Sequence, residues 1–207
     1  MIKNIFPIQV YETEFENYTA IKENLVDNLL FLFKEEENQK LSMRYNTSSN
    51  KINLHNNPKL SVVFDFINLH INNYWNNISE IDPKYNVKPY ILNTWINIIP
   101  NGKAISSHNH NPCIFGGVFY VDADHKNGNL FLENPLDYLL GRMPWIHNPL
   151  NNPKNFSEEI SVFDGKLILF PGWMKHYSSE NMEDKNRISI GINVGCHGKY
   201  ITVTENY

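Results

Sequence analysis

The chain has 207 residues, a formal net charge of −4 and a pI of about 6.0, with 42% hydrophobic and 13% aromatic residues. This composition excludes an intrinsically disordered chain and favours one folded domain over residues 1–207. The charge provides no basic surface for a nucleic-acid backbone, so nucleic acid is not an expected partner.

The chain shows no sign of a targeting or membrane-spanning segment. Its first fifteen residues hold no long apolar run, and no stretch approaches the ~18 apolar residues of a membrane-spanning helix. Cys113 and Cys196 have no CxxC spacing, so a disulfide is possible but two reduced thiols are the better expectation. We therefore expect a soluble, cytoplasmic protein.

Residues 1–88 are predicted to form a helical support region. Residues 5–15 alternate as a strand does, and apolar residues at helical spacing follow from Thr19, a candidate N-cap, to about Lys34. A second helix is expected from about Pro58 to Ile78, because its apolar residues recur on one face. Both helices are expected to pack on a sheet formed by the rest of the chain.

After Pro89 the pattern changes from a helical period to the two-residue alternation of strands. Strands are expected at 90–99, 116–122, 129–133, 159–164, 166–171 and 187–194. Asn127-Gly128, between the second and third of these strands, is a typical hairpin signal. Short, evenly spaced strands of this kind indicate an antiparallel sandwich or barrel.

One long interruption breaks this series of strands. Residues 134–157 are rich in proline and asparagine, and a loop of this length inside a β domain is usually functional. We interpret the loop as a lid or a substrate-binding segment.

Three histidines and one arginine carry most of the chemical information. In His108-Asn109-His110 the two histidines project to one side of an extended chain, His176 follows the strand 166–171, and Arg187 opens the last strand. Three imidazoles can hold a divalent metal and leave coordination positions open, and an arginine nearby can bind a carboxylate. Structural roles are the alternatives: loop histidines, a turn histidine and a solvated strand face.

Taken together, these segments resemble the Fe(II)- and 2-oxoglutarate-dependent oxygenases, and within that superfamily a group found in marine bacteria and phages. The motifs that carry the resemblance are TWIN (94–97), HNHNP (108–112), GGVFYV (116–121), GKLILFPGWMKH (165–176) and RISIGINV (187–194). The resemblance implies a mainly β (α+β) chain with a double-stranded β-helix, or cupin-like jelly roll, over 89–200. The N-terminal helices would pack on one of its sheets.

The resemblance also implies a role for each residue of the site. His108 and His176 would bind Fe(II), and His110 stands where most of the superfamily has Asp or Glu. Arg187 would bind the distal carboxylate of the co-substrate 2-oxoglutarate. The residues expected to assist it are Ser189, Tyr120 and Asn97. Ascorbate is the implied reductant for reactivating the iron.

The implied activity is a dioxygenase that hydroxylates a small molecule or a side chain and releases succinate and CO₂. A histidine in place of a carboxylate raises the charge of the site by one unit, so two alternatives stay open. One is a three-histidine metal dioxygenase that uses no 2-oxoglutarate, and the other is a non-catalytic jelly-roll binding module. A different strand register would instead let Asp122 or Asp124 supply a carboxylate.

Overall fold

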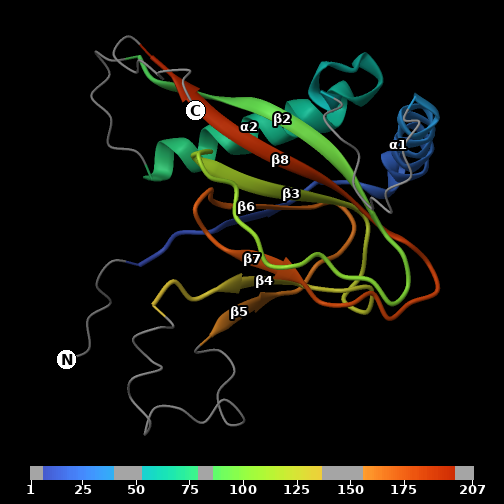
Figure 1. Cartoon of the computed structure of the whole chain (residues 1–207). Coiled ribbons are helices and arrows are strands. Elements are labelled where there is room, and N and C mark those ends of the chain that lie inside the picture. Colours follow the sequence, from blue (N-terminus) through green and yellow to red (C-terminus); the bar gives the residue numbers. More distant parts are fainter. Residues whose placement is uncertain (1–6, 40–52, 79–85, 137–155, 199–207) are drawn as a thin grey trace, which may run out of the picture.

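The structure of the protein is a computed structural model, which describes residues 7–39, 53–78, 86–136 and 156–198. Two antiparallel sheets and two long helices form it (Figure 1). The five-stranded sheet has the order β1-β6-β3-β8-β2, and the three-stranded sheet has the order β5-β4-β7. The strands are β1 (Tyr11–Glu14), β2 (Lys88–Ile99), β3 (Phe115–Asp122), β4 (Leu130–Glu133), β5 (Ser157–Ile160), β6 (Lys166–Pro171), β7 (His176–Ser178) and β8 (Arg187–His197).

Helices α1 (Thr19–Gln39) and α2 (Ser61–Ile78) cover the outer face of the five-stranded sheet (Figure 1). Two short 3₁₀ helices, η1 (Leu54–Asn56) and η2 (Pro58–Leu60), precede α2. Leu29 of α1 and Ile67 of α2 share one buried core with Ile190 and Ile192 of β8. The prediction that the helices pack on one sheet is confirmed, because the alternation in β8 turns its isoleucines toward them.

A second core lies between the two sheets. Ile168 and Phe170 of β6 enter it and meet Leu130 and Leu132 of β4. The intervening Leu167 and Leu169 face the helices, so β6 is buried on both faces and reads as a continuous apolar run. Two sheets enclosing a core confirm the predicted double-stranded β-helix.

Several element boundaries differ from those expected. The first strand spans only Tyr11–Glu14. In α1, the carbonyl of Tyr18 accepts a bond from Lys22 N at 3.1 Å, so the capping position is Tyr18 and not Thr19. Strand β5 stops at Ile160, and the Asn129 side chain binds the Val162 N–H at 3.2 Å where the predicted strand would have continued.

The expected hairpin between 116–122 and 129–133 is wrong. Strand β3 pairs with β6 and β8, whereas β4 pairs with β5 and β7 in the other sheet. The chain does turn at Asn127-Gly128, where Gly128 has φ +103°. That turn connects the two sheets. Strands β3 and β4 pair in different sheets because packing in the two cores determines their partners. A local turn signal carries no information about them.

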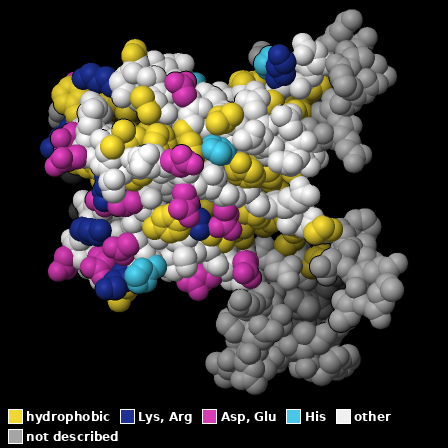
Figure 2. Space-filling model, turned by 180° about the vertical axis from the view of Figure 1, so that it is seen from behind, with side chains coloured by type: hydrophobic (Ala, Val, Ile, Leu, Met, Phe, Trp, Pro, Cys, Tyr) yellow, Lys and Arg dark blue, Asp and Glu magenta, His cyan; other side chains and the backbone are white. Residues whose placement is uncertain are grey.

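Most of the predicted lid, 134–157, lies outside the described residues, and a single domain over the whole chain stays a prediction. None of the described helices is long and apolar enough to cross a membrane. Cys113 and Cys196 are free thiols, as expected. On the face shown in Figure 2, acidic and basic side chains are interspersed among the described residues, without a continuous basic surface.

Candidate metal centre

The three histidines come from two segments that pair side by side. His176 opens β7, and His108 lies opposite it in an antiparallel bridge. The two residues exchange backbone bonds, from His108 N to His176 O at 3.0 Å and from His176 N to His108 O at 2.9 Å. His110 is held by a bond from its N–H to the Gly172 carbonyl at 2.8 Å. Backbone pairing thus fixes where all three side chains start.

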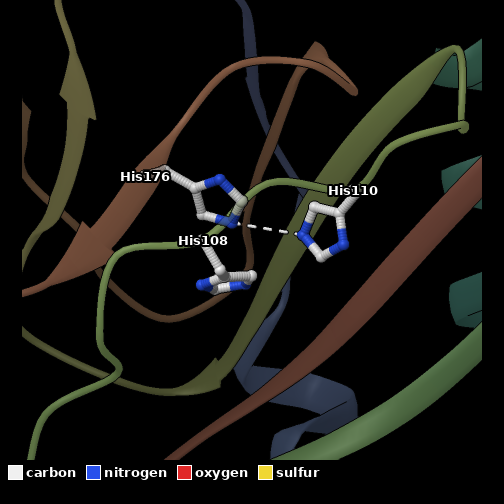
Figure 3. A group of neighbouring side chains, drawn as sticks. All are labelled: His108, His110 and His176. Atoms are coloured by element: carbon white, nitrogen blue, oxygen red, sulfur yellow. Dashed lines mark hydrogen bonds between the residues drawn. The ribbon is translucent and has the colours of Figure 1, made fainter.

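The three imidazole rings converge on one space (Figure 3). Their candidate ligand nitrogens lie within 4.8 Å of one another, and the Nε2 atoms of His110 and His176 are 3.2 Å apart. Two metal–imidazole bonds of about 2.1 Å at a right angle would put their nitrogens about 3.0 Å apart. The spacing therefore suits two ligands of one ion. Asn109, which lies between them in the sequence, is exposed.

Backbone carbonyls fix the tautomers of two rings. The Nδ1 atom of His108 lies 2.8 Å from the Ser106 carbonyl, and that of His176 lies 3.0 Å from the Met174 carbonyl. Because a carbonyl only accepts, the hydrogen must sit on Nδ1, which leaves the Nε2 lone pair free for a metal.

The cavity keeps two of the rings neutral. Burial, reinforced by the neighbouring His108, lowers the pKa of His110 to about 4. Burial also lowers the pKa of His176 to about 3, against the opposing effect of its bond to Met174. Both imidazoles are therefore neutral near pH 7, the form that binds a metal.

Within the described residues, the cluster contains no carboxylate. Asp122 binds Lys22 at 2.8 Å, and Asp124 lies 3.3 Å from Lys185. Both aspartates are thus engaged outside the cluster. Neither supplies the carboxylate that a shifted register would have required.

Glycines make room for the aromatic rings of the site. A Cβ on Gly116 would lie 2.8 Å from both His110 and Phe170. The Trp95 indole lies across Gly191 of β8, where a Cβ would clash with it, and its ring centroid is 5.5 Å from that of His110. Small residues on β3 and β8 therefore set the position of His110 and of the indole beside it.

Arg187 is among the largest fully buried side chains of the described residues. Its Nη1 donates to the carbonyls of Asn127 at 3.2 Å and Gly128 at 2.5 Å, and its Nη2 donates to Ser178 Oγ at 2.8 Å. All three acceptors are uncharged, and Nε has no partner among the residues that the structure describes. Burial lowers the pKa of this guanidinium, an effect that Tyr120 opposes. A buried cation with an unpaired donor is costly unless an anion completes it, so Arg187 suits a carboxylate ligand.

One cavity of about 100 Å³ between the sheets gathers every site residue named from the sequence: Asn97, His108, His110, Tyr120, His176, Arg187 and Ser189. Asn97 Nδ2 lies 3.5 Å from Ser189 Oγ, across the paired strands β2 and β8. Burial raises the pKa of Tyr120 to about 12, against the opposing charge of Arg187, so its hydroxyl stays protonated at neutral pH.

A larger cavity of about 460 Å³ lies beside β1 and β5. Its described lining includes Val10, Glu12 and Lys166 but no histidine. We place the candidate chemistry in the smaller cavity, because of these two described cavities it is the one that combines candidate metal ligands with a buried arginine.

Sequence reasoning missed Ser178 and the two carbonyls that hold Arg187. Ser178 lies two residues after His176, so strand alternation puts both on the same face of β7. The strand has only three residues, too few for a visible pattern. Backbone carbonyls, such as those of Asn127 and Gly128, leave no signal in residue identities at all.

Residues 93–193 match a family model described as "Putative 2OG-Fe(II) oxygenase". The matched segment holds all of the predicted site residues. Among curated proteins, none matches this sequence significantly.

Solved structures of similar fold include AviO1 from Streptomyces viridochromogenes Tue57, with 11% identity, a TM-score of 0.58, and 91% of this chain and 90% of that chain covered. HygX from Streptomyces hygroscopicus, with nickel and 2-oxoglutarate bound, has 9% identity, a TM-score of 0.58, and coverage of 91% and 83%. EctD from S. alaskensis, with 2-oxoglutarate and 5-hydroxyectoine, has 15% identity, a TM-score of 0.56, and coverage of 91% and 72%. At such identities the likeness shows the fold. The family match adds that residues 93–193 resemble the 2OG-Fe(II) oxygenases.

Proposed function

We propose that this protein is an Fe(II)- and 2-oxoglutarate-dependent dioxygenase that hydroxylates a small molecule or a side chain. The observation that carries the proposal is a single cavity holding both the three-histidine cluster and Arg187 with its unpaired Nε. Metal ligands beside a buried cation suit a co-substrate that chelates a metal at one end and carries a carboxylate at the other. The 2-oxoglutarate bound in HygX and EctD supports this interpretation.

His108, His110 and His176 would hold the iron. Imidazole suits Fe(II), and three protein ligands leave positions open for a chelating 2-oxoacid and for oxygen. When bound, Fe(II) and 2-oxoglutarate supply the oxidising chemistry: one atom of O₂ enters the substrate and the other enters succinate, with release of CO₂. The carbonyls of Ser106 and Met174 keep two of the rings aimed at the cavity.

Arg187 would bind the distal carboxylate of 2-oxoglutarate. A charge-assisted bond from a buried guanidinium is strong, because little water competes for the anion. The residues that would assist it as hydrogen-bond donors are Ser189, Tyr120 and Asn97, all lining the same cavity. These side chains orient the co-substrate and keep water away from it.

The test is an anaerobic titration of Fe(II)-loaded protein with 2-oxoglutarate, followed by the weak visible charge-transfer band of a chelated 2-oxoacid. We expect the band to appear and saturate in the wild type and to be lost in Arg187→Ala. Lys185→Ala is the matched control, because it removes an exposed cation that pairs with Asp124 outside the cavity. Stoichiometric iron binding without any band would contradict the proposal.

A three-histidine dioxygenase that uses no 2-oxoacid is the second candidate. It is favoured by the absence of a carboxylate from the described cluster, and Arg187 would then bind a carboxylate of the substrate itself. Oxygen consumption separates the candidates, since only the first requires 2-oxoglutarate. His110→Asp sharpens the test by restoring two histidines and a carboxylate. Faster 2-oxoglutarate turnover in that variant would identify position 110 as the carboxylate position.

A further inference from the structure

The hydroxyl of Ser178 lies where the anion-binding and metal-binding parts of the cavity meet. Ser178 is buried on β7, two residues after His176. Its Oγ accepts hydrogen bonds from Arg187 Nη2 at 2.8 Å and from Ile105 N at 2.9 Å. The Ser178 N–H also donates to the Ile105 carbonyl at 3.1 Å. Ile105 comes three residues before His108, so one serine holds both the arginine and the segment that leads to the histidines.

Among the described residues, the hydrogen bonds of Arg187 leave Nε without a partner and give Nη2 one partner. The group has five N–H donors in a rigid planar fork. Nη1 uses its two hydrogens on the carbonyls of Asn127 and Gly128, and Nη2 uses one on Ser178. The Nε hydrogen, which has no partner, and the second Nη2 hydrogen remain. Nε–H and the Nη2 hydrogen next to it share one edge of the plane, and this pair would match the two oxygens of a carboxylate if Ser178 takes the other Nη2 hydrogen.

Ser178 is the hydrogen-bond partner of the Nη2 end of the guanidinium. The two carbonyls hold only the Nη1 end, so without a partner on Nη2 the plane could tilt and point its free donors elsewhere. The hydroxyl oxygen uses its acceptor capacity on Arg187 and Ile105 together. The backbone of the metal-binding segment therefore fixes the position of the hydroxyl. The hydroxyl in turn fixes the position of Nη2.

We propose that Ser178 is a positioning residue for the co-substrate. By holding Nη2 it turns the Nε–Nη2 edge of Arg187 toward the cavity, so that the distal carboxylate binds side-on. This inference rests on the proposed function, because it takes Arg187 as the group that binds that carboxylate. To that function the inference adds a positioning role for Ser178 and a side-on orientation of the bound carboxylate.

The test measures binding by calorimetry in Ni(II)-loaded protein, with 2-oxoglutarate and with 2-oxobutanoate, which lacks the distal carboxylate. In Ser178→Ala we expect the 2-oxoglutarate affinity to fall by about tenfold or more, as for loss of a hydrogen bond to a charged group. Affinity for 2-oxobutanoate should stay unchanged. Ser178→Thr, which keeps the hydroxyl, should bind 2-oxoglutarate more tightly than the alanine variant.

Ser179→Ala is the matched control for this test. Its hydroxyl also accepts a backbone N–H, from Asn129 at 2.9 Å, and no hydrogen bond links it to Arg187. The control should bind both acids as the wild type does. If Ser178→Ala fails to fold, Ser178→Cys replaces it, because a thiol keeps the shape but accepts weakly.

Three outcomes would overturn the assignment. Unchanged 2-oxoglutarate affinity in Ser178→Ala would show that Ser178 does not position Arg187. An equal loss for both acids would show a general structural role. Failure of the proposed function is recognised separately, in the wild type: no 2-oxoglutarate binding there, or binding that Arg187→Ala leaves intact, overturns that function and this assignment with it.

Discussion

The two faces of the five-stranded sheet are built from the same strands and serve different ends. In β8, Ile190 and Ile192 pack beneath the helices, whereas Arg187 and Ser189 alternate with the isoleucines and line the cavity. Burial of the isoleucines stabilises the fold. Burial of an arginine whose partners are all neutral costs stability. The difference indicates that the outer face holds the chain together and that the inner face is kept polar for a ligand.

The largest expected effect comes from the inner face. His176→Ala should abolish stoichiometric metal binding, because it removes one of three converging imidazoles and leaves fewer ligands than a stable site needs. The free energy of unfolding of the metal-free protein should change far less than metal affinity does. Metal content after dialysis, measured by atomic absorption, provides the test.

His125→Ala is the control for this substitution, since His125 is exposed in the connection between β3 and β4. It should retain the metal in full. A His176→Ala protein that still binds one metal per chain would remove His176 from the ligand set. It would also weaken the view that the inner face is specialised for ligand binding.

The next effect compares neighbouring residues that point to opposite faces. Ile190→Ala should lower the free energy of unfolding by about 3 kcal/mol, because it leaves a cavity in a core where Ile190 is fully buried. Ser189→Ala should change it by less than about 1 kcal/mol, since the hydrogen bond that the described residues give the Ser189 hydroxyl, from Asn97, is long at 3.5 Å. Urea unfolding measures both. Equal losses would contradict the division of labour between the faces.

Much of this contrast was predictable from the sequence. The alternation in RISIGINV assigns each residue of β8 to a face, and the structure agrees because a strand buried on one face by helices has no other register. The same holds for β2, where Asn97 lines the cavity and Ile96 enters the helical core. Period and burial were therefore sufficient for the long strands.

The rest depended on contacts between distant segments, which no local pattern records. Strand β7 has three residues and exists because His108 and Leu132 flank it on either side. Its neighbours therefore had to be known before Ser178 could be seen beside His176. The same limit explains the mistaken hairpin at Asn127-Gly128. The sequence identified the residues of the candidate site, while the way in which Arg187 is held came only from the structure.

A smaller effect tests whether the close contact with Gly191 fixes the position of the Trp95 indole on the inner face. Gly191→Ala should cost about 1–3 kcal/mol of unfolding free energy, because its Cβ would overlap the Trp95 indole and push it from its place beside His110. Gly195→Ala, on the same strand and face, should cost less, since its Cβ would lie 3.0 Å from the exposed Leu92 side chain, whereas a Cβ on Gly191 would lie much closer to the Trp95 indole. Equal stability of both variants would show that the indole position is not fixed by Gly191.

The smallest effect is the pH dependence of the unfolding free energy of the metal-free protein. It compares the histidines of the cavity with a histidine on the helical side of the sheet. Burial lowers the pKa of His176 to about 3 and that of His110 to about 4 from an ordinary value of 6.5. As the pH falls below about 6.5, these histidines become protonated in the unfolded chain but stay neutral in the folded state, so the free energy of unfolding decreases. Above that pH their contribution to the free energy of unfolding stays constant. Between pH 7 and pH 6 the loss should be below about 1 kcal/mol for each histidine.

On the outer side, burial also lowers the pKa of His70, whose ring lies 2.8 Å from the Tyr11 hydroxyl beneath α2. Its environment is less buried than that of His176, so it should contribute less to the pH dependence. Urea unfolding in the presence of a chelator, at pH 7 and pH 6, compares His176→Gln with His70→Gln. We expect the first substitution to flatten the pH dependence more than the second. The opposite order would mean that His70 contributes more to the pH dependence than His176. The cavity around His176 would then be more hydrated than its burial indicates.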